Sequence, residues 1–421
     1  GRVVAVVAFC SDRQFSACWP SCVLCARHRM SRKRKSVPQV HAHGATTTHR
    51  GLTLVLDAPN DDLVDATRQL VTVESPTDDL TACAEVVEAA HELSRAWLSE
   101  PGRIERHGDR PVWRWGPSSP RVLLLGHLDT VWPVGTLERI PFAVDGDRMT
   151  GPGVFDMKAG VVQGWAALSM VTAHPEGSCG MLLTTDEETG SMASRDLIAE
   201  AITNAEAVFV LEPSADGALK TERKGTSWYH LTFTGRAAHA GLDPERGINA
   251  SVEAAHFITE AVTWADRSRG TSVTPTVMTS GTTSNTVPAE AALTVDVRAW
   301  TRAEQERVDA SVRSWELRHP EAAWSIGGGI DRSALESALS TDLFACAQRV
   351  AHDMGLPELS SRAVGGASDG NLTAAAGVPT LDGLGAVGDG AHADHEWASV
   401  SGMDERARLL AGLLSAIGGA A

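Results

Sequence analysis

The stretch Val-Leu-Leu-Leu-Gly-His-Leu-Asp-Thr, residues 122–130 of this 421-residue chain, decides the fold class. Its first four residues form an unbroken apolar run between Pro120 and Gly126, a pattern typical of a strand buried on both faces. Such a strand belongs to a sheet with helices on both sides. The stretch therefore predicts an α/β protein, and the predicted strand is followed at once by a histidine and an aspartate.

Patterns typical of buried strands and of helices recur before and after this stretch. Short apolar runs predict further buried strands at residues 181–185, 207–211 and 378–384. Apolar residues at helical spacing predict helices at residues 61–73, 81–98, 158–170, 194–200 and 339–354. Because strands alternate with helices, we expect a mostly parallel sheet with helices on both faces.

Residues 224–333 have a different pattern of apolar and polar residues. Residues 228–234 and 291–298 alternate like half-exposed strands, and a helical pattern at 248–264 lies between them. We interpret this segment, called the insert below, as a small α+β domain within a larger domain. The larger domain would then consist of residues 52–223 and 334–421, and residues 1–51 would form a leader.

Net charge and cysteine usage exclude several functions. The formal charge is −16, but residues 1–50 carry nine Lys or Arg and one acid, so the remaining 371 residues carry −24. A body that acidic predicts no binding to nucleic acid or to an anionic membrane. No apolar run approaches the roughly 18 residues of a membrane span. Three scattered cysteines outside the leader fit a reducing compartment and predict a cytoplasmic protein.

The leader contains Cys18, Cys22 and Cys25 at a spacing used for iron–sulfur clusters, and with His28 they could also form a small zinc site. No glycine-rich barrel sequence follows them. A polybasic run at 32–35 and a low-complexity tract at 41–49 follow instead. We therefore interpret residues 1–51 as a disordered or non-native extension.

Residues that could bind a divalent metal occur at five places where an apolar run stops, the edge at which an α/β sheet presents its functional groups. Two histidines, an isolated aspartate and two glutamate positions suit two zinc ions that share a carboxylate. An additional glutamate beside a ligand suits a general base. The residues concerned are His127 with Asp129, Asp156, Glu187 with Glu188, Glu212, and His392.

Each of these positions has a structural alternative. Asp129 could orient His127 by accepting its second ring N–H, but such a pair can also be a simple hydrogen bond. Asp156 could cap the helix that follows it. Three consecutive acids at 186–188 favour a bound cation, because crowded carboxylates are costly without one. His395 competes with His392 on composition alone.

Eight segments together resemble the successive motifs of the di-zinc aminoacylase and carboxypeptidase G family, over about residues 60–420. The segments are GHLDTVWP (126–133), GPGVFDMKAG (151–160), TTDEETGS (184–191), LEPS (211–214), GRAAHAG (235–241), SNTVPAEA (284–291), GGASDGN (365–371) and GAHADHEW (390–397). The resemblance implies a catalytic domain interrupted by a dimerisation domain, which would be the insert. It also implies a homodimer with two Zn²⁺ per subunit, for which Co²⁺ or Mn²⁺ could substitute.

The resemblance assigns a role to each candidate residue. Asp156 would bridge the two metal ions, with His127 and Glu212 at one and Glu188 and His392 at the other. Glu187 would be the general base and Asp129 the partner of His127. His239 resembles a histidine that reaches into a partner subunit to polarise the scissile carbonyl. Substrate contacts are implied for Asn285, Arg298, Arg332 and Gly366.

The function implied is cleavage of a C-terminal, glutamate-like amino acid from a small N-acyl or dipeptide-like amide. One alternative is an N-acyl-amino-acid deacylase, similar to acetylornithine deacetylase or succinyl-diaminopimelate desuccinylase, with the same metal chemistry. Another is a non-catalytic protein that binds peptides through its metals. A missing ligand or a substituted base would favour that second alternative, and neither is found in the sequence.

Overall fold

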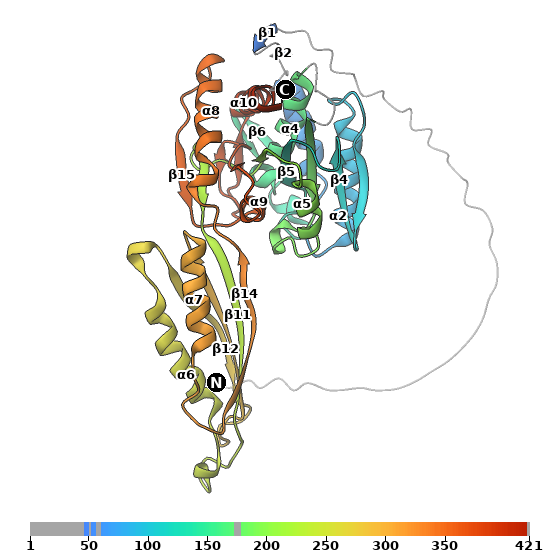
Figure 1. Ribbon diagram of the computed structural model, residues 1–421. Coiled ribbons are helices and arrows are strands. Elements are labelled where there is room, and N and C mark those ends of the chain that lie inside the picture. The colour runs from blue at the N-terminus through green and yellow to red at the C-terminus, as the bar shows by residue number, and fades with distance from the viewer. Residues whose placement is uncertain (1–45, 50–51, 56–59, 172–177, 419–421) are drawn as a thin grey trace, which may run out of the picture. The chain divides into compact units, whose positions relative to one another are not determined.

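A computed structural model describes residues 46–49, 52–55, 60–171 and 178–418 (Figure 1). The leader cysteines and the basic run at 32–35 lie outside the described residues, so the interpretations made for them remain predictions. A short antiparallel pair, β1 (Thr46–His49) and β2 (Leu52–Val55), precedes the first helix.

A six-stranded sheet in the order β16-β9-β5-β8-β4-β3 forms the centre of the larger domain. Its strands β16, β9, β5 and β8 are parallel to one another, whereas the β3–β4 hairpin adds an antiparallel edge. The strands are β3 (Arg103–His107), β4 (Arg110–Trp115), β5 (Val122–His127), β8 (Cys179–Thr184), β9 (Ala207–Val210) and β16 (Thr380–Leu381).

Helices cover both faces of this sheet, which confirms the predicted fold class. Val122 and Leu124 of β5 join the large core formed with α1, α2, α4, α8 and α10, whereas Leu123 and Leu125 face a smaller core with α5 and α9. The bounds are α1 (Asn60–Val71), α2 (Leu80–Ser94), α4 (Ala159–Met170), α5 (Arg195–Ala201), α8 (Thr341–Asp353), α9 (Asp369–Ala375) and α10 (Val400–Gly418).

The parallel strands bring separate parts of the sequence to one edge. His127, the last residue of β5, lies beside Thr184, the last residue of β8, and Leu125 of β5 lies beside Val210 at the end of β9. The segments that follow these strands therefore start at the same edge of the sheet. The candidate residues of three motifs lie on those segments.

The insert contains a four-stranded antiparallel sheet in the order β12-β13-β11-β14. Helices α6 and α7 cover one face of it (Figure 1), where Phe233, Phe257, Trp315 and Trp324 form a cluster with ring centroids 5.1–6.1 Å apart. The elements are β11 (Gly225–Thr234), α6 (Ala250–Ala261), β12 (Ser272–Ser280), β13 (Glu290–Ala299), α7 (Arg302–Ser314) and β14 (Ala323–Arg332).

Several elements differ from the sequence-based predictions. Strands β12 and β14 were missed, because β12 is largely exposed and contains Pro275, while glycines 327–329 interrupt the alternation of β14. The strand predicted at 378–384 is reduced to Thr380–Leu381. The backbone of Asp382 pairs with Lys220 of the neighbouring strand Leu219–Arg223 instead, and Gly383 adopts a φ of +77°. The hairpin β3–β4 was also missed.

Two small sheets complete the larger domain. In one, β17 (Gly388–Asp389) and β18 (Trp397–Ser399) join β7 (Arg148–Thr150) and β6 (Ala143–Asp145). In the other, β10 (Leu219–Arg223) pairs with β15 (Ser361–Val364). The first sheet fixes the late His392 segment beside the segment that leads to Asp156.

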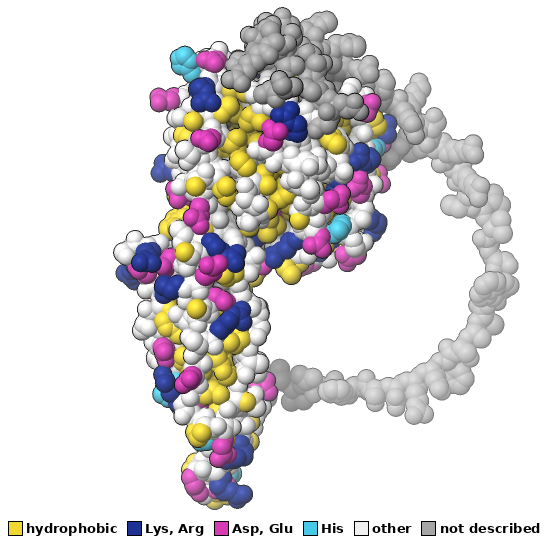
Figure 2. Space-filling view, viewed as in Figure 1, with side chains coloured by type: hydrophobic (Ala, Val, Ile, Leu, Met, Phe, Trp, Pro, Cys, Tyr) yellow, Lys and Arg dark blue, Asp and Glu magenta, His cyan; other side chains and the backbone are white. Residues whose placement is uncertain are grey.

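The surface charges and the helices can be described for the residues that the structure covers. Figure 2 shows Lys and Arg side chains interspersed with Asp and Glu over the face in view, so the acidic excess is not gathered into one patch there. Within the described ranges, no helix has both the length and the apolar character needed to cross a membrane.

Candidate metal centre

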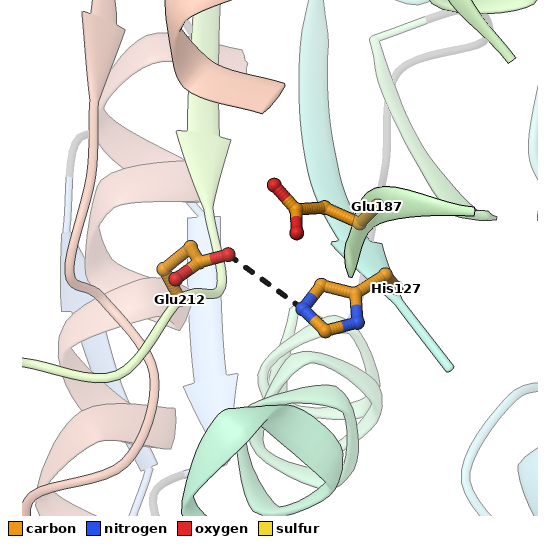
Figure 3. Close-up of side chains that lie close together, drawn as sticks. All are labelled: His127, Glu187 and Glu212. Carbon is orange, nitrogen blue, oxygen red and sulfur yellow. Dashed lines mark ion pairs between the residues drawn. The ribbon is translucent and has the colours of Figure 1, made fainter. Parts of the chain in front are cut away.

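Three parallel strands deliver the first group of candidate side chains. His127 ends β5, Glu187 begins the short 3-10 turn Glu187–Thr189 after β8, and Glu212 follows β9 by two residues. Their ligand atoms all lie within 4.8 Å of one another, and Figure 3 shows the three side chains directed toward one another. All three are buried, so two carboxylates and an imidazole share a volume with little water.

Asp156 lies between the two histidines and presents one oxygen to each. Its Oδ1 is 3.4 Å from His127 Nε2, which is also 3.6 Å from Glu212 Oε1. Its Oδ2 is 3.3 Å from His392 Nε2, which is also 3.1 Å from Glu188 Oε2. The residues thus form two half-sites with Asp156 common to both, the same division that the resemblance implies.

These distances fit divalent metal binding. Ligand atoms bound to one zinc ion at 2.0–2.2 Å in tetrahedral geometry lie roughly 3.3–3.6 Å apart, close to the four separations observed. His127 Nε2, Asp156 Oδ1 and Glu188 Oε1 are buried and have no hydrogen-bond partner in the described part of the chain. Buried polar atoms are rarely left without partners. A pair of cations would satisfy all three.

The protonation of His392 points the same way. Hydrogen bonds to Asp156 and Glu188 raise the pKa of His392 to about 10. Carboxylates that hold a proton on an imidazole can equally hold a divalent ion, which then replaces that proton. His392, rather than His395, is therefore the histidine that the structure brings to the cluster.

Asp129 contacts His127 and has further partners. The closest partner of His127 Nδ1 is the backbone carbonyl of Asp129 at 3.0 Å, and the Asp129 carboxylate is 3.5 Å away. The carboxylate instead accepts hydrogen bonds from Thr77 Oγ1 and from the backbone N–H groups of Glu187 and Glu188. Asp129 thus holds the paired glutamates as well as lying beside the histidine.

Glu187 is buried beside the cluster and forms a 2.8 Å ion pair with Arg332. Burial raises the pKa of its carboxyl to about 8, although the Arg332 guanidinium opposes this rise. Arg332 also pairs with Asp369 at 3.2 Å and donates a hydrogen bond to Ser191 Oγ at 3.0 Å. A residue predicted to contact substrate is thus occupied by two carboxylates of the protein.

In the described part of the chain, none of the remaining predicted substrate contacts has a hydrogen bond or ion pair with a candidate metal ligand, although Gly366 contacts Arg223 beside Glu212. Arg298 pairs with Asp296 on β13, and the carbonyl oxygen of Gly366 accepts a hydrogen bond from Arg223. His239 and Asn285 lie together in the insert, where the Asn285 carbonyl accepts from Ala240 N. Within the described residues of a single chain, no hydrogen bond or ion pair joins His239 or Asn285 to the metal cluster.

Sequence reasoning missed Arg223, which supports the ligand Glu212. Arg223 is buried, donates to both oxygens of Asp382 at 2.8 and 3.0 Å, and lies 3.2 Å from Glu212 Oε2. Lys220 Nζ is 4.0 Å from the same Glu212 oxygen. The sequence around Arg223 has the alternating pattern of an exposed strand, and its partner Asp382 lies 159 residues away in sequence. The supporting role of Arg223 could therefore not be predicted from local sequence.

Replacing Arg223 with methionine should destabilise the protein strongly. The change leaves Asp382 and Glu212 buried without their cation, and breaking a buried pair in this way costs about 3–5 kcal/mol. Urea denaturation of the metal-free protein measures the loss. Arg236→Met, which breaks an exposed pair with Glu321 in the insert, is the matched control and should change the free energy of unfolding little. Equal losses in the two variants would contradict the supporting role of Arg223.

The chain is similar to known proteins over most of its length. Residues 123–416 match the family described as Peptidase family M20/M25/M40. The chain is 31% identical over 375 residues to carboxypeptidase G2 of Pseudomonas sp. (strain RS-16), which covers 83% of this chain and 88% of that protein. It is 30% identical over 344 residues to succinyl-diaminopimelate desuccinylase of Bordetella avium (strain 197N), which covers 74% and 87%.

A solved structure shows the same fold. The YXEP protein of Bacillus subtilis, described as a dinuclear metal binding peptidase from M20 family, aligns with a TM-score of 0.58 at 14% identity. The alignment covers 86% of this chain and 99% of that one. The resemblance found in the eight sequence motifs is thus confirmed by comparisons that extend over most of the chain.

Proposed function

Because this chain belongs to peptidase family M20/M25/M40 and is a hydrolase acting on amide bonds, we propose that it removes a C-terminal, glutamate-like amino acid from an N-acyl or peptidyl amide. We further propose a homodimer with two Zn²⁺ per subunit, in which the insert at 224–333 is the dimerisation domain. The three cysteines of the described residues, Cys83, Cys179 and Cys346, are free thiols, which supports a reducing cytoplasmic location.

The arrangement around Asp156 carries the proposal. One carboxylate faces two histidines and each histidine has a second carboxylate beside it, while Glu187, whose ligand atom lies within 4.8 Å of those of His127 and Glu212, is assigned the role of base. His127, Asp156 and Glu212 would hold one ion, and Asp156, Glu188 and His392 the other. When bound, two such ions supply an acidified water and polarise the amide carbonyl.

The protein's own groups complete the reaction. Glu187 accepts the proton of the attacking water and returns it to the leaving amide nitrogen, the two tasks of a general acid–base. Its raised pKa favours the second task, because a carboxyl that titrates near pH 8 without metal holds a proton readily. Two nearby cations would lower that pKa and favour the first task.

His239 is suited to stabilise the oxyanion. Its Nδ1 accepts a hydrogen bond from Gly241 N at 3.1 Å, so in the neutral ring the proton is on Nε2. Nε2–H is then available as a hydrogen-bond donor. Because no contact of the described residues brings it to the metal cluster of the same chain, we propose that it serves the active site of a partner subunit.

Two cationic side chains beside the cluster, each paired with carboxylates of the protein, support the proposal of an acidic substrate. Arg332 and Lys220 lie beside Glu187 and Glu212, and such cations attract a substrate carboxylate and repel a basic side chain. Arg332 is held by Glu187 and Asp369, so its contact with a substrate carboxylate requires one of these pairs to open. Arg298, Asn285 and Gly366 remain proposed substrate contacts.

The test is turnover of the zinc-loaded protein on two sets of amides, with and without a chelator. One set contains N-acyl-glutamates and a folate-type glutamate amide, and the other contains N-acetyl and N-succinyl derivatives of basic amino acids. Chelator-sensitive release of glutamate is expected. Hydrolysis of the second set alone would contradict the carboxypeptidase proposal and assign the chain to the deacylases, the alternative suggested by its desuccinylase relatives. Two bound metals without turnover on either set would favour the non-catalytic alternative.

A further inference from the structure

Glu396 is a buried carboxylate that accepts a hydrogen bond from the backbone N–H of Asp156 and contacts the segments around both half-sites. Only 1% of its surface is exposed. Its Oε2 accepts from Trp132 Nε1 and Gly153 N, both at 2.9 Å. Its Oε1 accepts from Phe155 N at 2.9 Å and Asp156 N at 3.0 Å. Each carboxylate oxygen of Glu396 thus accepts two hydrogen bonds.

The three segments joined by Glu396 each carry metal-centre residues. Trp132 follows Asp129 by three residues in the segment that begins at His127. Gly153, Phe155 and Asp156 form the turn that presents the shared carboxylate. Glu396 itself follows His392 by four residues and leads into β18, which pairs with β7 just before that turn. A single carboxylate therefore connects segments that lie far apart in sequence.

Burial of this charge has a cost that only strong contacts offset. Three of its four donors are backbone N–H groups, which cannot change rotamer. These hydrogen bonds hold the Glu396 carboxylate in place, and the carboxylate in turn holds the backbone of the donor residues. The hydrogen bond to Asp156 N is the nearest to a ligand, because it lies on the same residue as the oxygens that face His127 and His392.

We propose that Glu396 is a positioning residue that fixes Asp156 and His392 relative to His127. It thereby sets the affinity for the metal ion that Asp156, Glu188 and His392 would hold, called the second ion below. This inference rests on the proposed two-metal function. Glu396 is not a ligand, because both oxygens are occupied by N–H donors. Residues behind a metal ligand commonly change metal affinity by about 10–100-fold when they are altered.

Glu396→Gln is the direct test. Glutamine keeps the shape of the side chain, but its NH₂ group replaces one carboxylate oxygen. Because NH₂ is a donor, it cannot accept the hydrogen bonds of the two N–H groups that face it. We expect the second Zn²⁺ to bind about 10–100-fold more weakly, measured by competition with a metal-chelating dye, and the visible spectrum of the Co²⁺-loaded protein to change. Turnover should recover as free zinc is raised, which a misfolded protein would not show.

Two further variants keep the test decisive. Trp132→Phe removes one donor without removing the carboxylate, so it should weaken the second ion in the same direction but by less, even if Glu396→Gln fails to fold. Glu253→Gln is the matched control, because Glu253 is a buried glutamate of the insert that accepts from the backbone N–H groups of Arg318 and His319 at 2.9 and 2.8 Å. It should lower thermal stability and leave both metal affinities unchanged.

The outcomes separate this inference from the proposed function. Wild-type affinity for both ions in Trp132→Phe and in folded Glu396→Gln would overturn the positioning role. Weakening of the second ion in Glu253→Gln to the same degree would also overturn it, because the effect would then follow from general destabilisation. Failure of the wild-type protein to bind two ions would instead refute the proposed metal centre itself.

Discussion

Glu187→Gln should reduce turnover by about 10²–10⁴-fold while the protein still binds two metal ions. Glutamine fills the same space and can still accept a hydrogen bond from Arg332, which is 2.8 Å from the native carboxylate. It cannot accept the proton of the attacking water, so the general base is lost without loss of a ligand. Steady-state kinetics on a hydrolysed amide, paired with elemental analysis of bound metal, measures both quantities.

Glu188→Gln provides the control for that result, since it changes the adjacent residue in the same way. Glu188 Oε2 is 3.1 Å from His392 Nε2, and we assign it to a half-site rather than to proton transfer. This variant should lose one metal ion and regain part of its activity at high free zinc. If Glu187→Gln lost metal, or kept activity close to wild type, the roles of the two neighbours would be wrongly assigned.

Asp156→Asn should have the largest effect on metal binding. Both Asp156 oxygens face a histidine, at 3.4 and 3.3 Å, so the change to an amide removes an anionic ligand from both half-sites at once. Metal content should fall from two ions to one or none per chain, and turnover should fall to background. Inductively coupled plasma mass spectrometry of desalted protein measures the content.

Glu212→Gln distinguishes a shared ligand from an ordinary one. Glu212 lies 3.6 Å from His127 and belongs to one half-site only, so its loss should weaken one ion and leave the other bound. Suppose that Asp156→Asn and Glu212→Gln each lost one ion, and that both variants bound the remaining ion with the same affinity. Asp156 would then not bridge the two half-sites.

The fold was predictable where burial imposes a simple pattern. A strand covered on both faces must be apolar throughout, so β5 and β8 were readable as runs of leucine, valine and methionine. The exposed strand β12 and the glycine-containing β14 carry no such pattern, because solvent and neighbouring strands tolerate many residues there. Their pairing with β13 and β11 depends on contacts distant in sequence.

The candidate site was predictable for the opposite reason. Zinc ligands are limited to His, Cys, Asp and Glu, and an α/β sheet gathers functional groups at the ends of its strands, so residue type and position together identify His127 and Glu212 as candidates, while Asp156 is a candidate from its glycine-flanked turn. Supporting residues obey no such restriction. Arg332 was expected to contact substrate, but its ion pair with Glu187 joins residues 145 positions apart, which no local pattern indicates.

The most direct measurement is the metal content of the wild-type protein, determined together with amide hydrolysis as zinc is added back to chelator-treated enzyme. We expect two ions per chain, no hydrolysis in their absence, and activity that returns as both half-sites fill. Full hydrolysis by protein that holds no metal, or saturation of activity with no second ion bound at any zinc concentration, would contradict the two-metal centre.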